Sequence, residues 1–275
     1  MDRRPDFAHR FTLRKLKLSP RCFVVVITMR ALILFAATAV LLSAAPTKEF
    51  NRTVPLGPGG RLSINTHKGS IHITGWDRRE VEIKARIEED PGWGSMRVDD
   101  VEIRVDASAS DVRVKSDYRR SGGWFSIEGP LPSVHYTIRM PRDAALTVKD
   151  HRSDSDVTGV EGEIEFDTYR GTARLNGLRA GLQLTTYRGD VRATFTEFSK
   201  RTHVDTYRGH VDLILPRGSA FSLDGDIGRH GNLDCDFPRT VRTSSRQRDW
   251  QSTVNGGGPA LKVKSYRGTI RLRAA

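Results

Sequence analysis

Apolar and polar residues alternate along most of the chain after residue 45. Val211, Leu213 and Leu215 are apolar, whereas His210 and Asp212 between or beside them are polar. A period of two places every second side chain on one face, which is typical of strands with one buried face. The helical pattern, with apolar residues at intervals of three, four and seven, is not sustained anywhere in this part of the sequence. The alternation therefore predicts an all-β fold.

A four-residue motif separates the alternating segments and returns along the chain. Thr168-Tyr169-Arg170-Gly171 recurs at 186–189 and 206–209, then as Ser265-Tyr266-Arg267-Gly268, and Thr66-His67-Lys68-Gly69 is a further copy. The tyrosines are 18, 20 and 59 positions apart, so the last interval is about three periods long. Inside that interval, residues 231–238 align with 209–216 at an offset of 22. This chain is therefore a repeat protein.

The spacing of apolar residues across the motif indicates a bend. The last apolar residue before it and the first one after it are always seven positions apart: Ile64 and Ile71, Phe166 and Ala173, Leu184 and Val191, Val204 and Val211, and Val263 and Ile270. A straight strand would place residues seven apart on opposite faces, so the chain must turn or bulge for both to be buried. A glycine at a fixed place in that bend suits a positive φ. The predicted turn glycines are Gly69, Gly171, Gly189, Gly209, Gly231 and Gly268.

One repeat of about 20 residues holds two short strands and cannot close a core alone, whereas stacked copies can. The sequence thus predicts a β-solenoid or β-roll-like stack, with a β-sandwich as the alternative. Residues 46–145 are an irregular β part and 146–275 carry the regular repeats. We expect the two parts to form one continuous domain.

Residues 1–45 are predicted to be a leader that exports the chain. The apolar run at 31–45 ends in small residues, which is the arrangement of a secretory signal helix with cleavage near Ala44 or Ala45. Met29 is an alternative start. An uncleaved membrane anchor is the alternative to cleavage, since a second short apolar run lies upstream. We expect the remainder to be secreted or to lie in the periplasm or cell envelope, and to meet the membrane only through an uncleaved leader.

Three segments resemble a known family. They are 60–77 (GRLSINTHKGSIHITGWD), 134–141 (VHYTIRMP) and the short stretch 146–148 (LTV), and the repeats of turn, glycine and alternating strand follow them. In this order they are similar to the bacterial "putative adhesin" domain family, a repetitive β domain of unknown function, over roughly residues 50–272. The resemblance implies a repetitive β fold and a cell-envelope setting. It implies no catalytic residues.

Charge and cysteine content exclude several classes of protein. The net charge is +12, and about half of it lies in the leader, so the remainder is only mildly basic. Such a surface suits an anionic polymer or an acidic envelope better than nucleic acid, which we do not expect as a partner. Cys235 is the one cysteine after the leader, which excludes a disulfide framework within the exported part and a cysteine zinc site.

The motif itself is the candidate binding surface. Stacked repeats would align Tyr169, Tyr187, Tyr207 and Tyr266 in a ladder, with Arg170, Arg188, Arg208 and Arg267 beside it. Arginine binds carboxylate or phosphate through forked hydrogen bonds, and tyrosine offers a flat apolar face, so such a ladder suits an anionic glycan or an envelope protein. In the structural alternative, which the turn already favours, the rings cover a corner and the arginines pair with Asp167 or Asp205 of neighbouring rungs.

No sequence motif indicates catalysis. There is no nucleophile elbow, phosphate loop or dinucleotide fingerprint, the histidines lack zinc spacing, and no cofactor is expected. The aspartates at 224, 226, 234 and 236 lack the spacing of a calcium loop. We therefore predict a non-enzymatic binding scaffold. The alternative is a polysaccharide-active lyase or hydrolase, for which Asp167, Asp190, Asp205 and Asp212 beside the arginine ladder would be the place to look.

Overall fold

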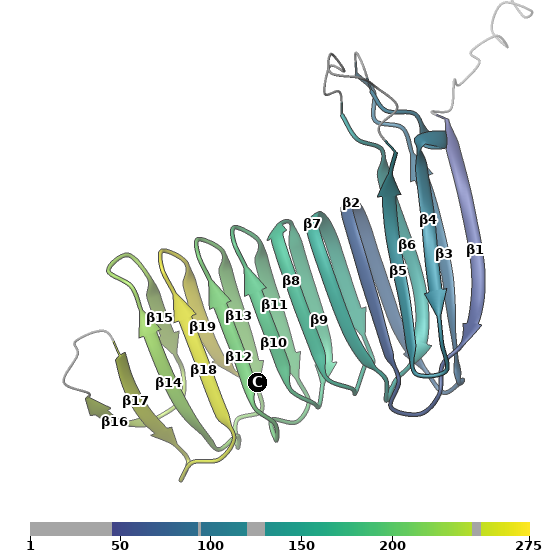
Figure 1. The fold of residues 1–275 in the computed structure, drawn as a ribbon. Helices are drawn as coiled ribbons and strands as arrows, with labels where there is room; N and C mark the ends of the chain where they lie inside the picture. Colours follow the sequence, from purple (N-terminus) through teal and green to yellow (C-terminus); the bar gives the residue numbers. More distant parts are fainter. Residues whose placement is uncertain (1–45, 93–94, 120–129, 244–248) are drawn as a thin grey trace, which may run out of the picture. The chain divides into compact units, whose positions relative to one another are not determined.

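The computed structural model describes residues 46–92, 95–119, 130–243 and 249–275 (Figure 1). This part of the chain forms nineteen strands and one short 3-10 helix, η1 (Val98–Asp100), so the all-β prediction is confirmed. The predicted leader and its signal helix lie outside the described residues. Within the described ranges, no helix has the length and apolar character needed to cross a membrane.

The strands differ in length between the N-terminal and the repetitive part. The N-terminal strands are β1 (Thr47–Pro55), β2 (Arg61–Trp76), β3 (Glu80–Glu88), β4 (Val101–Ala107), β5 (Asp111–Tyr118) and β6 (Ser133–Pro141). The next are β7 (Ala145–Thr158), β8 (Ile164–Arg170), β9 (Thr172–Leu178), β10 (Leu182–Thr186), β11 (Asp190–Phe195), β12 (Thr202–Thr206) and β13 (His210–Leu215). The last are β14 (Phe221–Ile227), β15 (Asn232–Cys235), β16 (Arg239–Thr243), β17 (Asp249–Val254), β18 (Ala260–Ser265) and β19 (Thr269–Ala274).

Each rung of the stack consists of two short strands joined by the four-residue motif, and equivalent strands pair in parallel. One row contains β8, β10, β12, β18 and β14, and the other contains β9, β11, β13, β19 and β15. The long strands β2 and β7 run through both rows. Phe166 lies opposite Leu184, and Leu184 lies opposite Val204, so equivalent positions stay in register from rung to rung. The predicted stack is therefore confirmed.

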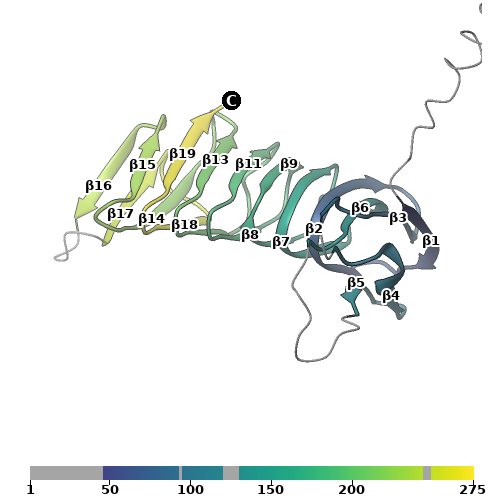
Figure 2. The same cartoon turned by 90° about the horizontal axis from the view of Figure 1, so that it is seen from above.

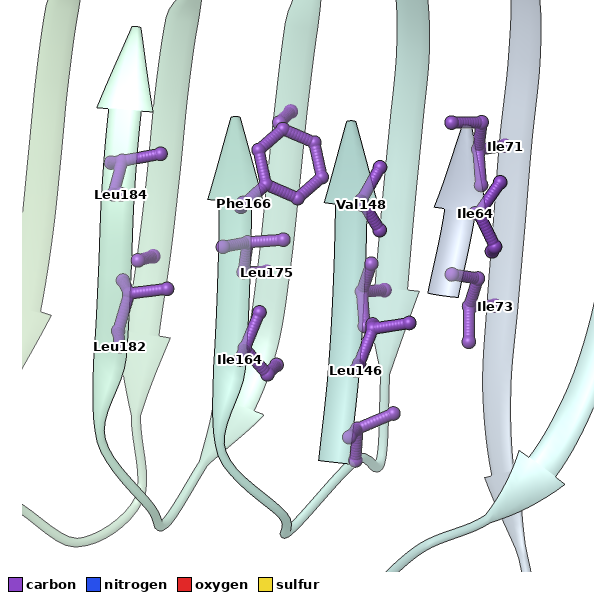
Figure 3. Close-up of a cluster of buried hydrophobic side chains, with 14 of the residues drawn as sticks. Ile64, Ile71, Ile73, Leu146, Val148, Ile164, Phe166, Leu175, Leu182 and Leu184 are labelled. Atoms are coloured by element: carbon purple, nitrogen blue, oxygen red, sulfur yellow. The ribbon is translucent and has the colours of Figure 1, made fainter. Parts of the chain in front are cut away.

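The core lies between the two rows. Ile164, Phe166, Leu182 and Leu184 project from one row and meet Leu175 from the other (Figure 3). In every apolar pair that flanks the motif, both residues are buried, which confirms the predicted bend. Because fully burying one such side chain contributes roughly 1.5–3 kcal/mol, the repeated apolar positions are a main source of stability.

The rungs are not stacked in the order of the sequence. The rung β18–β19 lies between β12–β13 and β14–β15 (Figures 1 and 2). The 59-residue interval between Tyr207 and Tyr266 therefore contains one rung and the antiparallel hairpin β16–β17, and the estimate of about three periods is wrong. The offset of 22 is correct in register, since His210 and Asn232 both lie opposite Thr269.

Antiparallel pairs complete the N-terminal part. β1 pairs with β3, β3 with β6, and β4 with β5. The strand β2 then joins this part to the regular rungs, because it pairs in parallel with β5 and β6 on one side and with β7 on the other. The turn motif of β2 is consequently the first in the row of turns described next.

Candidate binding site

The turns of six neighbouring rungs bring their aromatic rings into one continuous stack. Successive ring centroids from His67 through His151, Tyr169, Tyr187 and Tyr207 to Tyr266 are 4.5, 4.8, 4.7, 4.7 and 4.9 Å apart, with interplanar angles of 10° or less. Tyr118 meets the His67 end edge-on at 6.0 Å. The sequence-predicted tyrosines thus do form a ladder, and it is longer than expected.

Backbone hydrogen bonds hold the rings at this spacing. The amide of Tyr187 donates to the carbonyl of Thr168 (3.1 Å), and the amide of Tyr207 donates to the carbonyl of Thr186 (3.0 Å). The amide of Tyr266 donates to Thr206 in the same way (3.1 Å). Parallel pairing therefore continues into the turn, and it sets the distance between rings to about one strand spacing, roughly 4.8 Å.

The threonine or serine that opens the motif closes the turn on itself. The buried Thr186 Oγ1 accepts from the amide of Gly189 (2.9 Å) and donates to its carbonyl (3.1 Å). Thr206 donates to the carbonyl of Gly209 at 3.1 Å, and the Ser265 hydroxyl donates to that of Gly268 at 2.7 Å. The motif therefore satisfies its own backbone groups in the corner, where water has little access.

The motif glycine is required for two different reasons. Gly69 and Gly171 have positive φ values of 132° and 127°, as predicted. The expectation is wrong for the other turn glycines, Gly189, Gly209, Gly231 and Gly268, which are not in the positive-φ region. They are required by close approach instead: a Cβ on Gly209 would lie 2.0 Å from the carbonyl oxygen of Gly189, and one on Gly268 would lie 2.1 Å from that of Gly209.

The arginine after each ring forms a second column along the stack. It consists of Arg152, Arg170, Arg188, Arg208 and Arg267, one on each of five successive rungs. The last four guanidinium carbons lie 5.4–5.6 Å from the centroid of the preceding tyrosine ring. Since stacked neighbours cover both faces of the inner rings, these guanidinium groups lie beside the stack. We refer to these five residues as the arginine column.

Within the described part of the chain, no carboxylate forms an ion pair with any member of the arginine column. The expected pairing with Asp167 or Asp205 is therefore wrong, and Asp205 instead lies 3.7 Å from the Lys264 ammonium. Four of the five arginines are exposed and Arg170 is half-buried. The column is consequently a line of positive charge that the described part of the chain does not neutralise.

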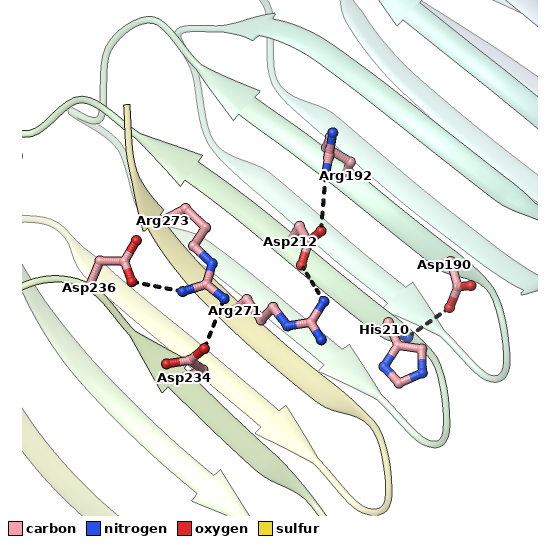
Figure 4. Close-up of polar contacts among 8 residues, drawn as sticks. All are labelled: Asp190, Arg192, His210, Asp212, Asp234, Asp236, Arg271 and Arg273. Atoms are coloured by element: carbon pink, nitrogen blue, oxygen red, sulfur yellow. Dashed lines mark hydrogen bonds and ion pairs between the residues drawn. The ribbon is translucent and has the colours of Figure 1, made fainter.

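The outer face of the other row differs in this respect (Figure 4). There Asp212 lies between Arg192 (3.4 Å) and Arg271 (3.6 Å), and Arg273 binds both Asp234 (2.8 Å) and Asp236 (2.7 Å). Arg192, Arg271 and Arg273 are thus paired with carboxylates of neighbouring rungs. Among the described residues, unpaired arginines beside the ring stack are therefore a feature of the turns and not of the whole surface.

A shallow hollow follows the opposite side of the ring stack. Its volume is about 240 Å³, and its walls include Lys149, Asp167, Thr185 and Asp205 together with the edges of Tyr169, Tyr187 and Tyr207. The expectation that the tyrosines would offer flat faces is wrong for the inner rings, because their neighbours cover both faces. Only edges and hydroxyl groups are accessible there. Tyr266, at the end of the stack, is 50% exposed.

Two histidines of the stack were not predicted as ring-stack members. His151 belongs to Asp150-His151-Arg152-Ser153, a variant of the motif that lies 18 positions before the copy at 168–171. The spacing identifies it, although serine replaces glycine and histidine replaces tyrosine. His67 lies in a recognised copy, where its ring occupies the tyrosine position.

The four acidic residues considered for an enzyme do not form one group: Asp167 and Asp205 line one hollow, and Asp190 and Asp212 line another. Asp167 and Asp205 belong to the outer side of one row, whereas Asp190 and Asp212 belong to the other. Asp190 accepts a hydrogen bond from the amide of His210 (3.0 Å). Among the residues that the structure describes, no group of three or more histidine, cysteine, aspartate or glutamate side chains is placed to hold a metal ion.

The carboxyl of Asp150 has a raised pKa because it is buried in its turn. It accepts hydrogen bonds from the amides of Arg152 (3.1 Å) and Ser153 (3.0 Å) and from the Thr168 hydroxyl (3.0 Å), which oppose the effect of burial. The carboxyl thus replaces the threonine of the other motif copies. Its role in the turn is structural.

Comparisons with known proteins identify a family and several solved structures. The family model described as Toastrack DUF4097 matches residues 53–273. A "putative cell adhesion protein" from Clostridium sporogenes is 14% identical, with a TM-score of 0.47 over 83% of this chain and 100% of that one. A "putative adhesin" from Bacteroides fragilis is 12% identical, with a TM-score of 0.37 over 83% and 97%. A "putative lipid binding protein" from Parabacteroides distasonis is 9% identical, with a TM-score of 0.23 over 83% and 98%. No curated protein matches the chain.

Proposed function

Because the chain belongs to the Toastrack DUF4097 family, in agreement with its resemblance to a repetitive β domain of unknown function, we propose that it is a non-enzymatic binding scaffold of the cell envelope or the secreted fraction. Its ligand is an extended anionic glycan that lies along the arginine column. The single observation that carries this proposal is the column itself, in which five arginines stand in line without carboxylate partners in the described part of the chain.

The spacing of the column suits a repeating polymer. Adjacent arginines of the column lie on neighbouring strands, whose backbones are about one strand spacing apart, so an extended chain of carboxylated or phosphorylated sugars meets several of them at once. Each exposed contact is weak, but linked contacts add through high effective concentration. The accessible tyrosine edges and hydroxyls beside the column provide additional hydrogen bonds to such a ligand.

Binding of a polyuronate such as alginate to the purified protein tests the proposal, with neutral dextran as the reference polymer. We expect Arg188→Ala and Arg208→Ala each to weaken binding by about two- to tenfold, and the double variant to weaken it further. Added NaCl should weaken binding in the wild-type protein, since the contacts are exposed. Arg192→Ala is the matched control, because it removes one exposed positive charge from the other row and leaves Asp212 beside Arg271.

Three outcomes would contradict the proposal. Equal weakening by Arg192→Ala would indicate attraction by net charge alone. Unchanged affinity in the Arg188→Ala, Arg208→Ala double variant would remove the column from the site. Cleavage of the polyuronate, abolished completely by one substitution, would establish the alternative of a polysaccharide-active enzyme.

A further inference from the structure

The ring stack ends where one rung lacks an aromatic residue. On β14–β15, Gly228 occupies the place that Tyr266 holds on the preceding rung: Ile227 lies opposite Ser265, and the amide of Gly228 donates to the carbonyl of Ser265 (2.7 Å). This bond matches the one from Tyr266 to Thr206. The position that would hold the next ring therefore carries no side chain, and Tyr207 covers Tyr266 on one face only.

The backbone of this turn keeps the position free of a side chain. A Cβ on Gly228 would lie 2.8 Å from the carbonyl oxygen of Tyr266. The amide of Gly231 donates to the carbonyl of Gly228 (3.0 Å), which closes a tight turn with Arg229 and His230 exposed at its tip. The turn thus differs from the other copies by one extra residue and places two potentially cationic side chains beside the open ring.

A larger hollow adjoins the uncovered ring. Its volume is about 650 Å³, within the usual range of small-molecule sites, compared with about 240 Å³ for the hollow along the inner rings. Its walls contain Tyr207, Tyr266, Asp205, Asp226, Lys264, Arg229 and His230. The hollow thus combines an aromatic surface with carboxylates and cationic groups.

We infer that this hollow binds one ring of an acidic sugar, stacked on the outer face of Tyr266. The C–H face of a pyranose is apolar and suits an aromatic face. Ring hydroxyls can donate to the Asp226 or Asp205 carboxylate, while the sugar carboxylate is attracted to Arg229 and Lys264. Lys264 and Asp205 already lie 3.7 Å apart, whereas Asp226 and Arg229 form no ion pair within the described part of the chain. A purely aromatic ligand would use only the stacking surface and would leave Asp226 and Arg229 in that condition. The inference rests on the proposed function, since the site takes the same class of sugar, but it concerns a single ring.

Titration with the monosaccharide glucuronate, followed by ligand-detected NMR, tests this site apart from the arginine column. We expect Tyr266→Ala to weaken glucuronate binding by about tenfold, whereas Tyr266→Phe keeps the ring face and binds as the wild type. Arg229→Ala should weaken binding of glucuronate more than that of neutral glucose. Arg174→Ala, which removes an exposed arginine from the other row, should leave it unchanged.

The inference is wrong if glucuronate does not bind, if Tyr266→Ala binds it as the wild type does, or if Arg174→Ala weakens it equally. Circular dichroism of each variant establishes that it is folded. The two proposals fail independently: glucuronate binding that depends on Tyr266 supports the end site even if polyuronate does not bind, and polyuronate binding that depends on Arg188 and Arg208 supports the column even if glucuronate does not bind.

Discussion

In three neighbouring turns, the glycine of one rung (Gly189, Gly209 or Gly268) lies against the glycine carbonyl of the next rung. This contact is tightest at Gly209, where a Cβ would lie 2.0 Å from the Gly189 oxygen. Backbone atoms on both sides belong to paired strands, so neither can move without loss of hydrogen bonds. The glycine therefore sets how closely two rungs approach.

We predict that Gly209→Ala lowers the free energy of unfolding by about 1–3 kcal/mol or more, because the added methyl group must push two rungs apart. Urea denaturation measures the loss. Gly218→Ala is the matched control, since no atom lies within 4 Å of the added Cβ and its φ is not positive. It should be neutral or stabilising by up to about 1 kcal/mol. Equal effects of the two substitutions would contradict the close-approach explanation.

The position of these glycines could be predicted from the sequence, but their physical role could not. The seven-residue spacing between apolar residues requires a bend, and glycine is the recurrent residue in it. At Gly171 both the φ angle and a carbonyl of the neighbouring rung require glycine, whereas at Gly209 only the neighbour's carbonyl does, and this contact depends on the distance to another rung. A single sequence contains no measure of that distance.

The buried carboxyl of Asp150 predicts a pH effect. Its pKa is raised in the folded state, so between its ordinary unfolded value near ~3.9 and the folded value the folded protein holds more protons. The contribution of Asp150 to stability therefore rises as the pH falls through this window. In urea denaturation from about pH 7 to about pH 4, the wild type should gain stability relative to Asp150→Asn. A wild type that loses stability relative to Asp150→Asn over this pH range would contradict the assignment.

At the scale of the elements, stacked rings join the rungs on the outside of the bend. Tyr187 contacts rings on both sides at 4.7 Å, whereas Tyr266 contacts one ring at 4.9 Å.

We predict that Tyr187→Ala costs roughly 1–3 kcal/mol of stability and Tyr266→Ala roughly half as much, because each ring contact contributes about 0.5–1.5 kcal/mol. Thermal unfolding measures both. Tyr187→Phe keeps the ring and should remain within about 0.5 kcal/mol of the wild type; an equal cost for both alanine variants would show that stacking contributes little.

The sequence predicted the four tyrosines of this stack, because identical motifs at similar spacing occupy equivalent places in a repeat. It did not identify His151, where three of the four motif residues differ and only the arginine is kept. The charge environment of the arginines was predicted incorrectly for another reason. Ion pairing in a stack depends on which charged side chains of neighbouring rungs lie next to each other. Asp205 lies next to Lys264, which belongs to a rung much later in the sequence.

At the scale of the whole stack, the rung β18–β19 lies between two rungs that precede it in the chain. It pairs in parallel with four strands, β12, β13, β14 and β15. The strands β12 and β13 also pair with β10 and β11, whereas β14 and β15 have no other parallel partner within the described part of the chain. The sequence could not show this order. All rungs have the same alternation of apolar and polar residues, so any rung could stack on any other. The sequence shows only the offset of 22 residues between the copies at 209–216 and 231–238. That offset is the same whether or not a third rung lies between these two copies.

We predict that a chain ending at Gly258 loses most of its cooperative unfolding transition and binds a hydrophobic dye, because the inner faces and edges of these strands lose their partner. Urea denaturation and dye fluorescence measure the two effects. A permuted chain, in which residues 259–275 follow Leu215 and precede Phe221, should retain the transition, since all rungs are present. A truncated chain that unfolds like the full one would contradict the inserted position.

The inserted rung also has a consequence for biosynthesis. In most stacked repeat proteins each new unit can settle on the previous one as it leaves the ribosome, so growth and folding proceed in the same direction. Here β14–β15 is synthesised before the layer that separates it from β12–β13. The nascent chain must hold these two layers apart, or separate them again, until β18–β19 arrives, and an interrupted translation product therefore exposes unpaired strands that a protease or chaperone can recognise.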